Sequence, residues 1–480
     1  MYHIGDLKKF VRCPLLYYLS RDNETSFSQF LRTDESTVNL LKKHLHIDDC
    51  FVGETGDDNE AFFKNKDKHE WFINTRFNDA GLRIKVPVIH KDGDKYDLYF
   101  IYHGTSIKEL DVFYYSINLE LINKIGIDID DVYIATINGD YVFDDCLDTD
   151  ELFNITDHFK GKRLIDIFSE EMFDYKDIIK RIESTSIDSY SPKKTRTCHL
   201  KNICPYYYEC FKEEKDLPDD SILSLVSSQY KDDMYKDGII QLKDADLDRV
   251  EGNRLQYAQI KASQNGGLFV DKLALKEFLN NINKRPISFV DFEWDTYLIP
   301  RYKGMKALDV IPFEYALYVL DKDSEELKNY SFVGNGDCRR EFLEGLLEKL
   351  PKEGPILAYN AYGAECKRLK ELEEIYPEYS EQIEDILSRF VDLAIPFLEG
   401  IVYDIRMGGN FTLKRLVNVV SNLNYKDLDI CDGMDAVYSW RGIDRGLDVD
   451  EQEIVEQLIK YCSLDAYGLY LVYKWLYTLI

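Results

Sequence analysis

Two carboxylates stand one residue apart in the stretch ISFVDFEWDTY, residues 287–297. The apolar, β-branched run that leads into them is typical of a buried strand. Side chains two apart on a strand face the same side, so Asp291 and Glu293 point together. Burying two like charges costs several kcal/mol and raises a pKa unless something compensates. A divalent cation such as Mg²⁺ or Mn²⁺ compensates, because these ions take hard oxygen ligands.

A centre with two cations needs more than two carboxylates, and the C-terminal stretch from 448 to 476 supplies a third. This stretch is a helix pattern whose apolar stripe includes Asp465, with Tyr461 four residues earlier on the same face. A lone carboxylate on a buried stripe is unusual. We expect the helix to begin at a capping box made by Asp448 and Glu451.

Two further acids follow strand patterns and are candidates for the remaining ligand. Glu365 opens a helix pattern just after the short strand that ends at Asn360, and Asp392 lies in the strand pattern RFVDL. Asp392 is the weaker candidate, because an aspartate at a strand end is more often structural. Which of the two acids is the ligand stays open at this point.

The elements that must position these residues form an α/β pattern over residues 284–480. In chain order they are strands at 287–294, 313–321 and 329–334, a helix at 338–350, a strand at 354–360, and helices at 364–376 and 381–390. Three meandering strands followed by a crossover strand match an RNase H-like mixed sheet flanked by helices.

Five short motifs follow one another along this region. They are DFE (291–293), YNAYGAE (359–365), VDL (391–393), GNFTLK (409–414) and YCSLDA (461–466). With them the region resembles the DnaQ-like 3′–5′ exonucleases of the DEDD type, in the branch with a tyrosine before the last aspartate. It resembles more closely an uncharacterised RNase H-like domain found fused to RecB-like nuclease domains. The spacing from Asn360 to Glu365 is one residue longer than the usual pattern.

The resemblance implies a nuclease that degrades single-stranded DNA or RNA from the 3′ end. Asp291, Glu293, Glu365 and Asp465 would hold two Mg²⁺ or Mn²⁺ ions, and Tyr461 would orient the attacking water. Asn360 and Lys414 would contact the nucleic acid, the lysine through phosphate. The formal net charge of −28 would repel nucleic acid, and bound cations would screen the acidic site.

Each of these residues has a simpler interpretation when taken alone. The two strand acids could be a solvated strand end, Tyr461 could pack in a core, and Lys414 could lie on the surface. Asn360 could end its strand by binding backbone. The hypothesis therefore depends on the joint pattern. The competing hypothesis is a non-catalytic nucleic-acid-binding or complex-assembly protein in which both nuclease folds are degenerate.

Residues 1–215 mix helix and strand patterns and end in a cysteine cluster. Cys13 lies in a helix pattern at 8–19, and a later stretch, TCHLKNICPYYYEC, brings Cys198, Cys204 and Cys210. One early and three late cysteines resemble RecB-family nucleases that carry a [4Fe–4S] cluster. Four thiolates suit such a cluster or Zn²⁺. The alternative is four buried cysteines in a reduced protein.

RecB-like nucleases place an aspartate on one strand and E-x-K on the next. The matching strands here are 82–90 and 96–106, where the expected aspartate falls near Pro87 and the expected E-x-K falls at Phe100–Ile101–Tyr102. Phenylalanine cannot bind a metal ion, and tyrosine cannot replace the charge of lysine. We therefore expect this N-terminal RecB-like α/β domain to be inactive and to bind or position nucleic acid.

The chain of 480 residues is long enough for two or three domains. We expect domains at 1–215 and 284–480, joined by a helical connector at 216–283. The sequence has no run of about 18 apolar residues and a charged N-terminus, which predicts a cytoplasmic protein. Ten cysteines in that setting favour metal binding or burial over disulfides.

Overall fold

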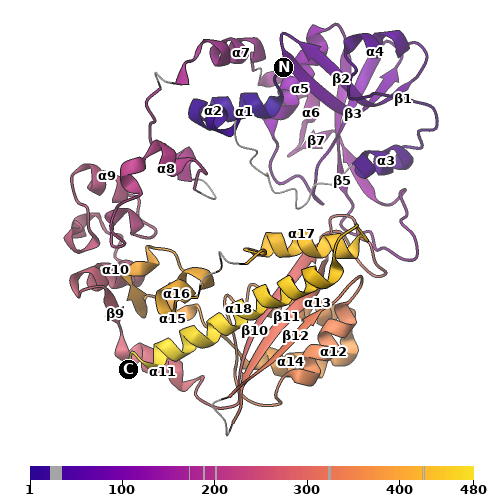
Figure 1. Cartoon of the computed structure of the whole chain (residues 1–480). Coiled ribbons are helices and arrows are strands. Elements are labelled where there is room, and N and C mark those ends of the chain that lie inside the picture. The colour runs from indigo at the N-terminus through magenta and orange to yellow at the C-terminus, as the bar shows by residue number, and fades with distance from the viewer. Residues whose placement is uncertain are drawn as a thin grey trace. The chain divides into compact units, whose positions relative to one another are not determined.

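The computed structural model describes residues 1–21, 35–171, 173–187, 190–199, 203–322, 326–423, 425 and 428–480. The chain forms two compact units. Unit 1 contains residues 1–215 and 296–309, and unit 2 contains residues 216–295 and 310–480 (Figure 1). The segment that was expected to be a connector, 216–283, belongs to unit 2, where β9 (Leu268–Val270) pairs with β15 (Val402–Asp404).

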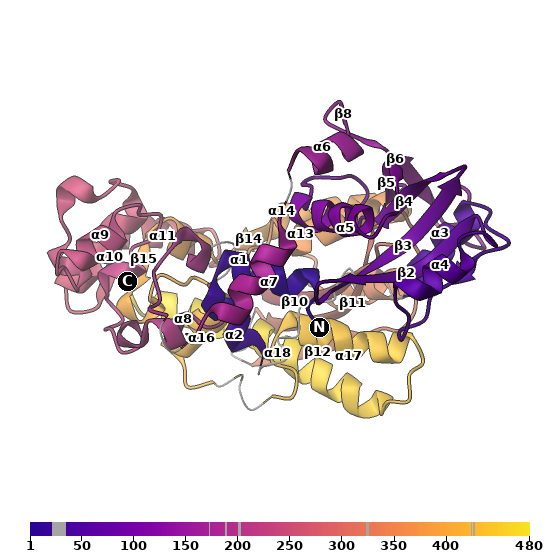
Figure 2. The ribbon, with the colours of Figure 1, turned by 90° about the horizontal axis from the view of Figure 1, so that it is seen from above.

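Unit 1 is built on a six-stranded sheet in which the strands follow their order in the chain. The strands are β1 (Phe51–Val52), β2 (Trp71–Asp79), β3 (Leu82–Asp92), β4 (Lys95–Ile101), β5 (Ile129–Ile137) and β6 (Phe153–Thr156). One face packs on α1 (Ile4–Arg12), α2 (Pro14–Arg21), α4 (Asn59–Asn65), α5 (Val112–Lys124), α6 (Leu164–Glu170) and α7 (Tyr175–Ser184). The other face packs on α3 (Glu35–His44). Figure 2 shows α5 lying along the strands.

The two strands that the resemblance matches to the catalytic strands of RecB-like nucleases are β3 and β4. The second of them ends at Ile101, so it is shorter than the expected 96–106. Phe100 is 2% exposed and lies in the core between the sheet and the helices. The position that the resemblance reserves for a carboxylate therefore holds a core side chain.

The helix expected over residues 8–19 is two helices, α1 and α2, which meet at Cys13 and Pro14. Proline has no N–H to donate to a continuing helix and disfavours helical backbone in the residue before it. Cys13 accordingly has an extended backbone. The break places this cysteine in the connection between the two helices rather than on a helix face.

The segment between β10 and β11, residues 296–309, belongs to unit 1 although both strands lie in unit 2. Leu298 and Met305 are buried, and Leu298 packs with the α3 side of the unit 1 sheet. The Phe143 N–H donates to the Met305 carbonyl at 2.8 Å, and the Gly304 N–H donates to the Phe143 carbonyl at 2.8 Å. These bonds hold the segment as an integral part of unit 1.

Unit 2 contains a five-stranded sheet of order β12-β11-β10-β13-β14. Its strands are β10 (Ile287–Thr296), β11 (Val310–Leu320), β12 (Leu327–Val333), β13 (Ile356–Ala358) and β14 (Phe390–Asp392). Strands β11 and β12 are antiparallel, whereas β13 is parallel to both β10 and β14. The predicted α/β class, with a mixed sheet flanked by helices, is confirmed.

The two faces of this sheet bury different partners. Val290 and Phe292 pack with α12 (Arg339–Lys349), α13 (Glu365–Ile375) and α14 (Ser380–Arg389). Phe289 points the opposite way, and its ring lies 5.6 Å from that of Tyr470 on α18 (Glu451–Tyr477). Because side chains alternate along a strand, Asp291 and Glu293 share the face that α18 covers (Figure 1).

The remaining helices of the described residues are short. They are α8 (Tyr207–Cys210) in unit 1, and α9 (Lys231–Lys236), α10 (Arg254–Gln264), α11 (Lys272–Asn280), α15 (Ile395–Leu398), α16 (Leu413–Val420) and α17 (Gly433–Asp444) in unit 2. Unit 1 also has a small ribbon of β7 (His158–Phe159) and β8 (Lys162–Arg163). Across the described ranges, no helix has both the length and the apolar character that a membrane span requires.

The start of α18 differs from the expected capping box of Asp448 and Glu451. The capping residue is Asp450, whose carboxylate accepts from the Glu453 N–H at 3.1 Å. Aspartate caps a helix because its carboxylate accepts a hydrogen bond from an N–H of the first turn. Asp448 and Asp450 both stand just before the apolar stripe of the helix, so the sequence pattern does not distinguish them as caps. The shift of two residues leaves Tyr461 and Asp465 on the same helix face.

Asp295 fastens α17 to the strand that carries the paired acids. Its side chain is 1% exposed, and its two oxygens accept from Arg441 Nε at 2.7 Å and Nη2 at 2.6 Å. A two-point pair between a guanidinium and a carboxylate fixes orientation as well as distance. The pair therefore sets the position of α17 along the edge of the acidic face.

We expect Arg441→Met to lower the free energy of unfolding of the full chain by about 3–5 kcal/mol, because it removes the guanidinium that pairs at two points with the buried Asp295 carboxylate. Urea denaturation followed by circular dichroism measures the change. Arg445→Met, at an exposed position at the end of the same helix, is the control and should change stability by no more than about 0.5 kcal/mol. Equal losses in the two variants would contradict the assigned role of the pair.

Candidate metal centre

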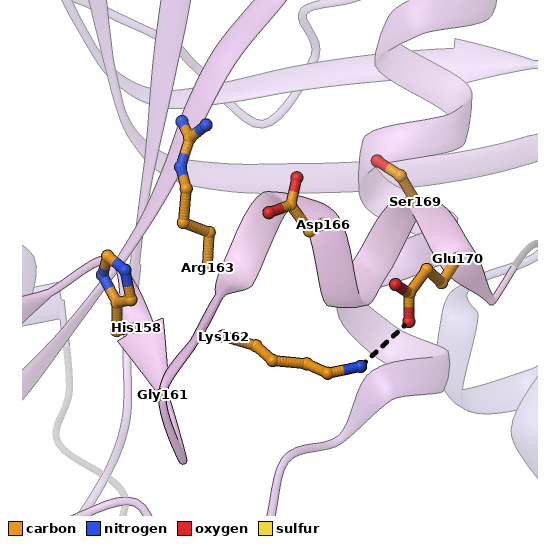
Figure 3. Close-up of a pocket in the computed structure, with 7 residues that line it drawn as sticks. All are labelled: His158, Gly161, Lys162, Arg163, Asp166, Ser169 and Glu170. Atoms are coloured by element: carbon orange, nitrogen blue, oxygen red, sulfur yellow. Dashed lines mark hydrogen bonds and ion pairs between the residues drawn. The ribbon is translucent and has the colours of Figure 1, made fainter.

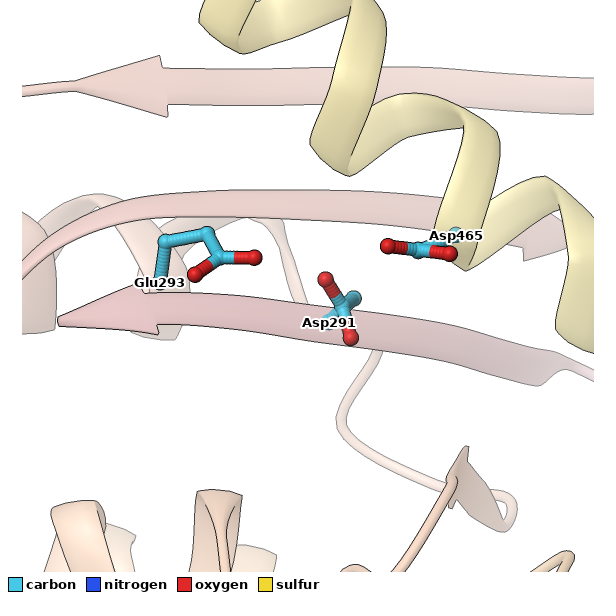
Figure 4. Close-up of side chains that lie close together, drawn as sticks. All are labelled: Asp291, Glu293 and Asp465. Carbon is cyan, nitrogen blue, oxygen red and sulfur yellow. The ribbon is translucent and has the colours of Figure 1, made fainter. Parts of the chain in front are cut away.

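Three carboxylates meet between β10 and α18. One oxygen each from Asp291, Glu293 and Asp465 lies within 4.8 Å of the others. Figure 4 shows the strand carboxylates and the helix carboxylate turned toward one another. Within the described part of the chain, this is the one group of three or more His, Cys, Asp or Glu side chains with that geometry. The spacing suits a shared cation with oxygen ligands.

A cleft of about 350 Å³ opens over this group. Glu365, the first residue of α13, lines the cleft together with the three acids, Lys414 and Tyr461. Glu365 is 3% exposed, and its Oε2 has no hydrogen-bond partner among the described atoms. The structure thus brings four of the sequence-predicted carboxylates to one cleft.

The carboxylates of the cleft repel one another in a buried setting. Burial is the largest cause of a raised pKa at Asp291, and Asp465 and Glu293 add to it. Burial followed by Asp465 raises the pKa of Glu293 to about 8, although Lys414 lowers it. Burial also raises the pKa of Glu365 to about 8. A hard divalent cation fits this donor set, since it would neutralise the charges and bind the unpartnered oxygen.

Lys414 and Tyr461 lie beside the acids, as expected. The ammonium group of Lys414 lies 4.7 Å from the centre of the Tyr461 ring and donates to the Cys431 carbonyl at 2.7 Å. The pKa of Asp465 is raised by burial, and hydrogen bonds from Tyr425 and Tyr461 and the charge of Lys414 lower it. The tyrosine hydroxyl that was expected to orient a water therefore lies at the carboxylate of the last acid.

Two predicted residues have backbone roles instead. Asp392 Oδ1 accepts from the N–H groups of Asn360 and Ala394, each at 2.9 Å. This fastens the end of β13 to the end of β14. Asn360 is exposed, has a left-handed backbone with φ 57°, and is absent from the residues that line the cleft. Glu365, rather than Asp392, is the acid that faces the three-carboxylate group.

Sequence reasoning missed three residues of this centre. Tyr425 donates to Asp465 Oδ1 at 2.7 Å, and the Cys462 thiol lies 3.4 Å from Asp291 Oδ2. Glu314 is fully buried on β11. Glu314 had a detectable signal, because it is a lone acid inside the apolar run of β11, as Asp465 is on α18. Tyr425 lies in a stretch without periodicity and had none.

The four predicted cysteines line one cavity in unit 1. The Cys204 N–H donates to the Cys198 carbonyl at 2.9 Å, and Arg12, next to Cys13, donates to the Thr197 carbonyl at 2.7 Å. Burial, together with the smaller effects of the other three thiols, raises the pKa of Cys210 to about 11. Residues 200–202 of the quoted stretch lie outside the described residues. The four thiols are the donor types that an iron–sulfur cluster or a zinc ion uses, but no three of their sulfur atoms lie within 4.8 Å of one another.

A second hollow in unit 1, of about 590 Å³, contains none of the predicted site residues. Figure 3 shows Lys162 extended toward Glu170, and the two pair at 3.5 Å. Arg163, which also lines the hollow, pairs with Asp131 at 2.7 Å. Its two cations, Lys162 and Arg163, are therefore paired within the protein, and we assign the hollow no ligand.

Residues 288–412 match a family described as a domain of unknown function, DUF2779. The match includes Asp291, Glu293 and Glu365 and ends before Lys414 and the helix that carries Asp465. No curated protein and no solved structure matches the chain. The comparisons therefore name a domain without naming an activity.

The acids of the cleft predict a pH-dependent stability. The pKa values of Glu293 and Glu365 lie near 8, against an ordinary 4.5. Between these values the folded, metal-free chain keeps protons that the unfolded chain has released, so its stability falls as the pH rises. We expect the Tm in EDTA to decrease from about pH 5 to about pH 8, and added Mn²⁺ to raise Tm most at the upper end.

Scanning fluorimetry across this pH range measures both effects. The variant Asp291→Asn with Glu293→Gln is the control, since it removes two of the titrating groups and two oxygen ligands. It should show a flatter pH profile in EDTA and little response to Mn²⁺. A wild-type response to Mn²⁺ in this variant would place the ion elsewhere.

Proposed function

We propose that unit 2 is a metal-dependent 3′–5′ exonuclease that hydrolyses phosphodiester bonds of single-stranded DNA or RNA. The observation that supports it best is the meeting of Asp291, Glu293 and Asp465 within 4.8 Å. These residues come from the first strand of a mixed sheet and from the last helix, and Glu365 and Tyr461 line the same cleft. Each belongs to a motif on which the DnaQ-like resemblance depends.

The strand order adds support that does not depend on the side chains. Numbered along the chain, the five strands lie in the order 3-2-1-4-5, with the first strand at the centre. This is the arrangement that an RNase H-like sheet requires, and it puts the DFE motif on the central strand. The carboxylates therefore lie at the middle of the sheet, where α18 crosses it.

The residues of the cleft divide the chemistry among them. Two Mg²⁺ or Mn²⁺ ions, when bound, would supply an activated water and stabilise the leaving 3′ oxygen. The four carboxylates would hold the ions, and the Tyr461 hydroxyl would hold the attacking water in line with the phosphorus. Lys414 places a positive charge at the cleft, where it would offset the charge of the scissile phosphate.

For unit 1 we propose a supporting role in binding or positioning nucleic acid, with the cysteines Cys13, Cys198, Cys204 and Cys210 as ligands of a [4Fe–4S] cluster or a Zn²⁺ ion. Their meeting at one cavity supports this. Phe100 in the place of a nuclease acid argues against a second catalytic centre. Reduced thiols are kept in the cytoplasm, which we propose as the location.

A second candidate is a non-catalytic nucleic-acid-binding or assembly protein. Two contacts favour it, because groups expected to serve a substrate or an ion already have protein partners. Lys414 donates to the Cys431 carbonyl, and Tyr425 donates to Asp465. Binding of Mn²⁺ at the three carboxylates, seen by anomalous scattering, would separate the catalytic candidate from this one.

We expect the purified chain with Mg²⁺ or Mn²⁺ to shorten a 5′-labelled single strand stepwise from its 3′ end. The variant Asp291→Ala with Glu293→Ala should lose at least about 10³-fold in rate, since several kcal/mol of transition-state stabilisation depend on the ions. Gel separation of 5′- and 3′-labelled DNA and RNA, with EDTA as a second blank, measures polarity and substrate together. Equal rates for the double variant would rule out this centre.

A matched pair on α18 sharpens the assay. Tyr461→Phe removes the hydroxyl at Asp465 and should lower kcat by about 10²-fold with little change in KM. Tyr470→Phe, on the same helix but packed against Phe289 and outside the cleft lining, should keep the wild-type rate.

For the cysteines, we expect the chain purified without oxygen to be brown and to contain iron, or to be colourless and contain zinc. Cys210→Ala should lose most of that metal, because four ligands are needed to hold either group firmly. Cys146→Ala, an exposed cysteine of unit 1, is the control and should retain the metal. Elemental analysis and visible absorption distinguish iron from zinc and measure how much metal each variant retains. Equal metal content in the two variants would contradict the assignment of the cysteines as ligands.

A further inference from the structure

Glu314 is a buried acid whose surroundings give it no partner. It lies on β11, is fully buried, and neither of its side-chain oxygens has a hydrogen bond to any described residue. Leaving a buried polar group unsatisfied costs about 1–3 kcal/mol, and more if the group is charged. If Glu314 served only to pack the core, an apolar residue would be more stable at this position. The presence of an acid there therefore requires another explanation.

The strand geometry turns Glu314 toward the metal centre. Ala316 and Tyr318, two and four residues further along β11, pack with Cys462 and Ala466 of α18. Glu314 shares their side of the sheet, which is also the side of Asp291 and Glu293. Its pKa is raised by burial first and then by the charges of Glu293 and Asp465. Two of the three clustered carboxylates are thus its electrostatic neighbours.

Glu314 is nevertheless outside the group of oxygens that lie within 4.8 Å of one another, and it is not among the residues that line the cleft, so it would reach a cation only through water. Direct ligands of one cation must lie about that close, since each bonds to the same ion. Mg²⁺ gives up its water reluctantly and usually keeps several water ligands. An acceptor just behind the direct ligands suits those waters, and such outer groups orient a metal site.

We propose that Glu314 is a positioning residue of the metal centre, whose unpartnered oxygens accept hydrogen bonds from the water ligands of a cation held by Glu293 and Asp465. The inference rests on the metal centre of the proposed function and adds a fifth carboxylate to it. In the loaded site both oxygens of the acid gain a hydrogen-bond donor, and the acid gains a nearby positive charge. The unpartnered carboxylate lowers the stability of the metal-free chain, and the same carboxylate strengthens cation binding.

The test compares Mn²⁺ binding with stability in the full chain. Titration calorimetry and Mn²⁺ paramagnetic resonance measure Kd and stoichiometry, and Tm in EDTA measures the metal-free fold. Glu314→Gln removes the charge and one acceptor oxygen, and we expect Mn²⁺ to bind about 10- to 100-fold more weakly. Its Tm in EDTA should be unchanged or higher, because an unpartnered acid has been removed.

Two more variants keep the test decisive. Methionine is similar in length to glutamate and has no oxygen, so the Glu314→Met chain should fold. It should bind Mn²⁺ as weakly as the Glu314→Gln chain, or more weakly. Glu120→Gln changes a buried glutamate of unit 1 that also has an unpartnered oxygen, and it should bind Mn²⁺ like the wild type.

Each outcome has a distinct meaning. Wild-type Mn²⁺ affinity in both Glu314 variants would overturn the positioning role and leave the proposed nuclease untouched. A lower Tm in EDTA for both, with metal affinity unchanged once folded, would make Glu314 structural and overturn the inference as well. If the wild-type chain binds no Mn²⁺ at millimolar concentration, the metal centre itself fails, and the inference fails with it.

Discussion

The packing of α18 on one face of the unit 2 sheet is the interaction on which the candidate site depends. It brings Asp465, which is 6% exposed, to Asp291 and Glu293 of β10, which are half-buried in the cleft. The apolar contacts along the same interface, such as Phe289 with Tyr470 and Ala316 with Ala466, hold the carboxylates together against their repulsion. A fully buried side chain such as Phe289 contributes roughly 1.5–3 kcal/mol, which is comparable to the cost of one buried charge interaction.

Strand β10 shows how differently the chain treats acids that share one face. Asp291, Glu293 and Asp295 are each two residues apart and point to the same side. Asp295 receives the guanidinium of Arg441 in a two-point pair. Asp291 accepts a hydrogen bond from the Cys462 thiol. The positive charge of Lys414 lowers the pKa of Glu293, but the ammonium group itself donates to the Cys431 carbonyl. The chain therefore pairs Asp295 with a guanidinium, whereas Asp291 and Glu293 face the cleft without such a two-point pair.

Local periodicity was sufficient to predict the main features of this site. The alternation of side chains predicted that Asp291 and Glu293 face together, and the helical stripe predicted that Tyr461 and Asp465 lie on one buried face. Each of these relations depends on neighbours within a single element. The same logic applied to β11 would have singled out Glu314.

Relations between elements could not be predicted from periodicity. That Asp465 shares a site with Asp291 and Glu293 was expected from the number of ligands that a metal centre needs and from the resemblance. Which of Glu365 and Asp392 faces the cleft depends on how β13 and β14 end side by side, where the Asp392 carboxylate is used by two backbone N–H groups. The assignment of residues 296–309 to unit 1 depends on the burial of Leu298 and Met305 by a separate part of the chain. No periodicity within a short segment encodes such pairings, because they are properties of the packed fold.

The cysteines of unit 1 illustrate what a metal could add to the fold. Cys13 lies at the break between α1 and α2, and the other three lie at the far end of unit 1, after α7. A group bound by all four would close a loop of most of the unit, and the entropy of closing a loop grows with its length. Metal binding would then be linked to the stability of unit 1, as in other small domains whose ligands come together only on folding.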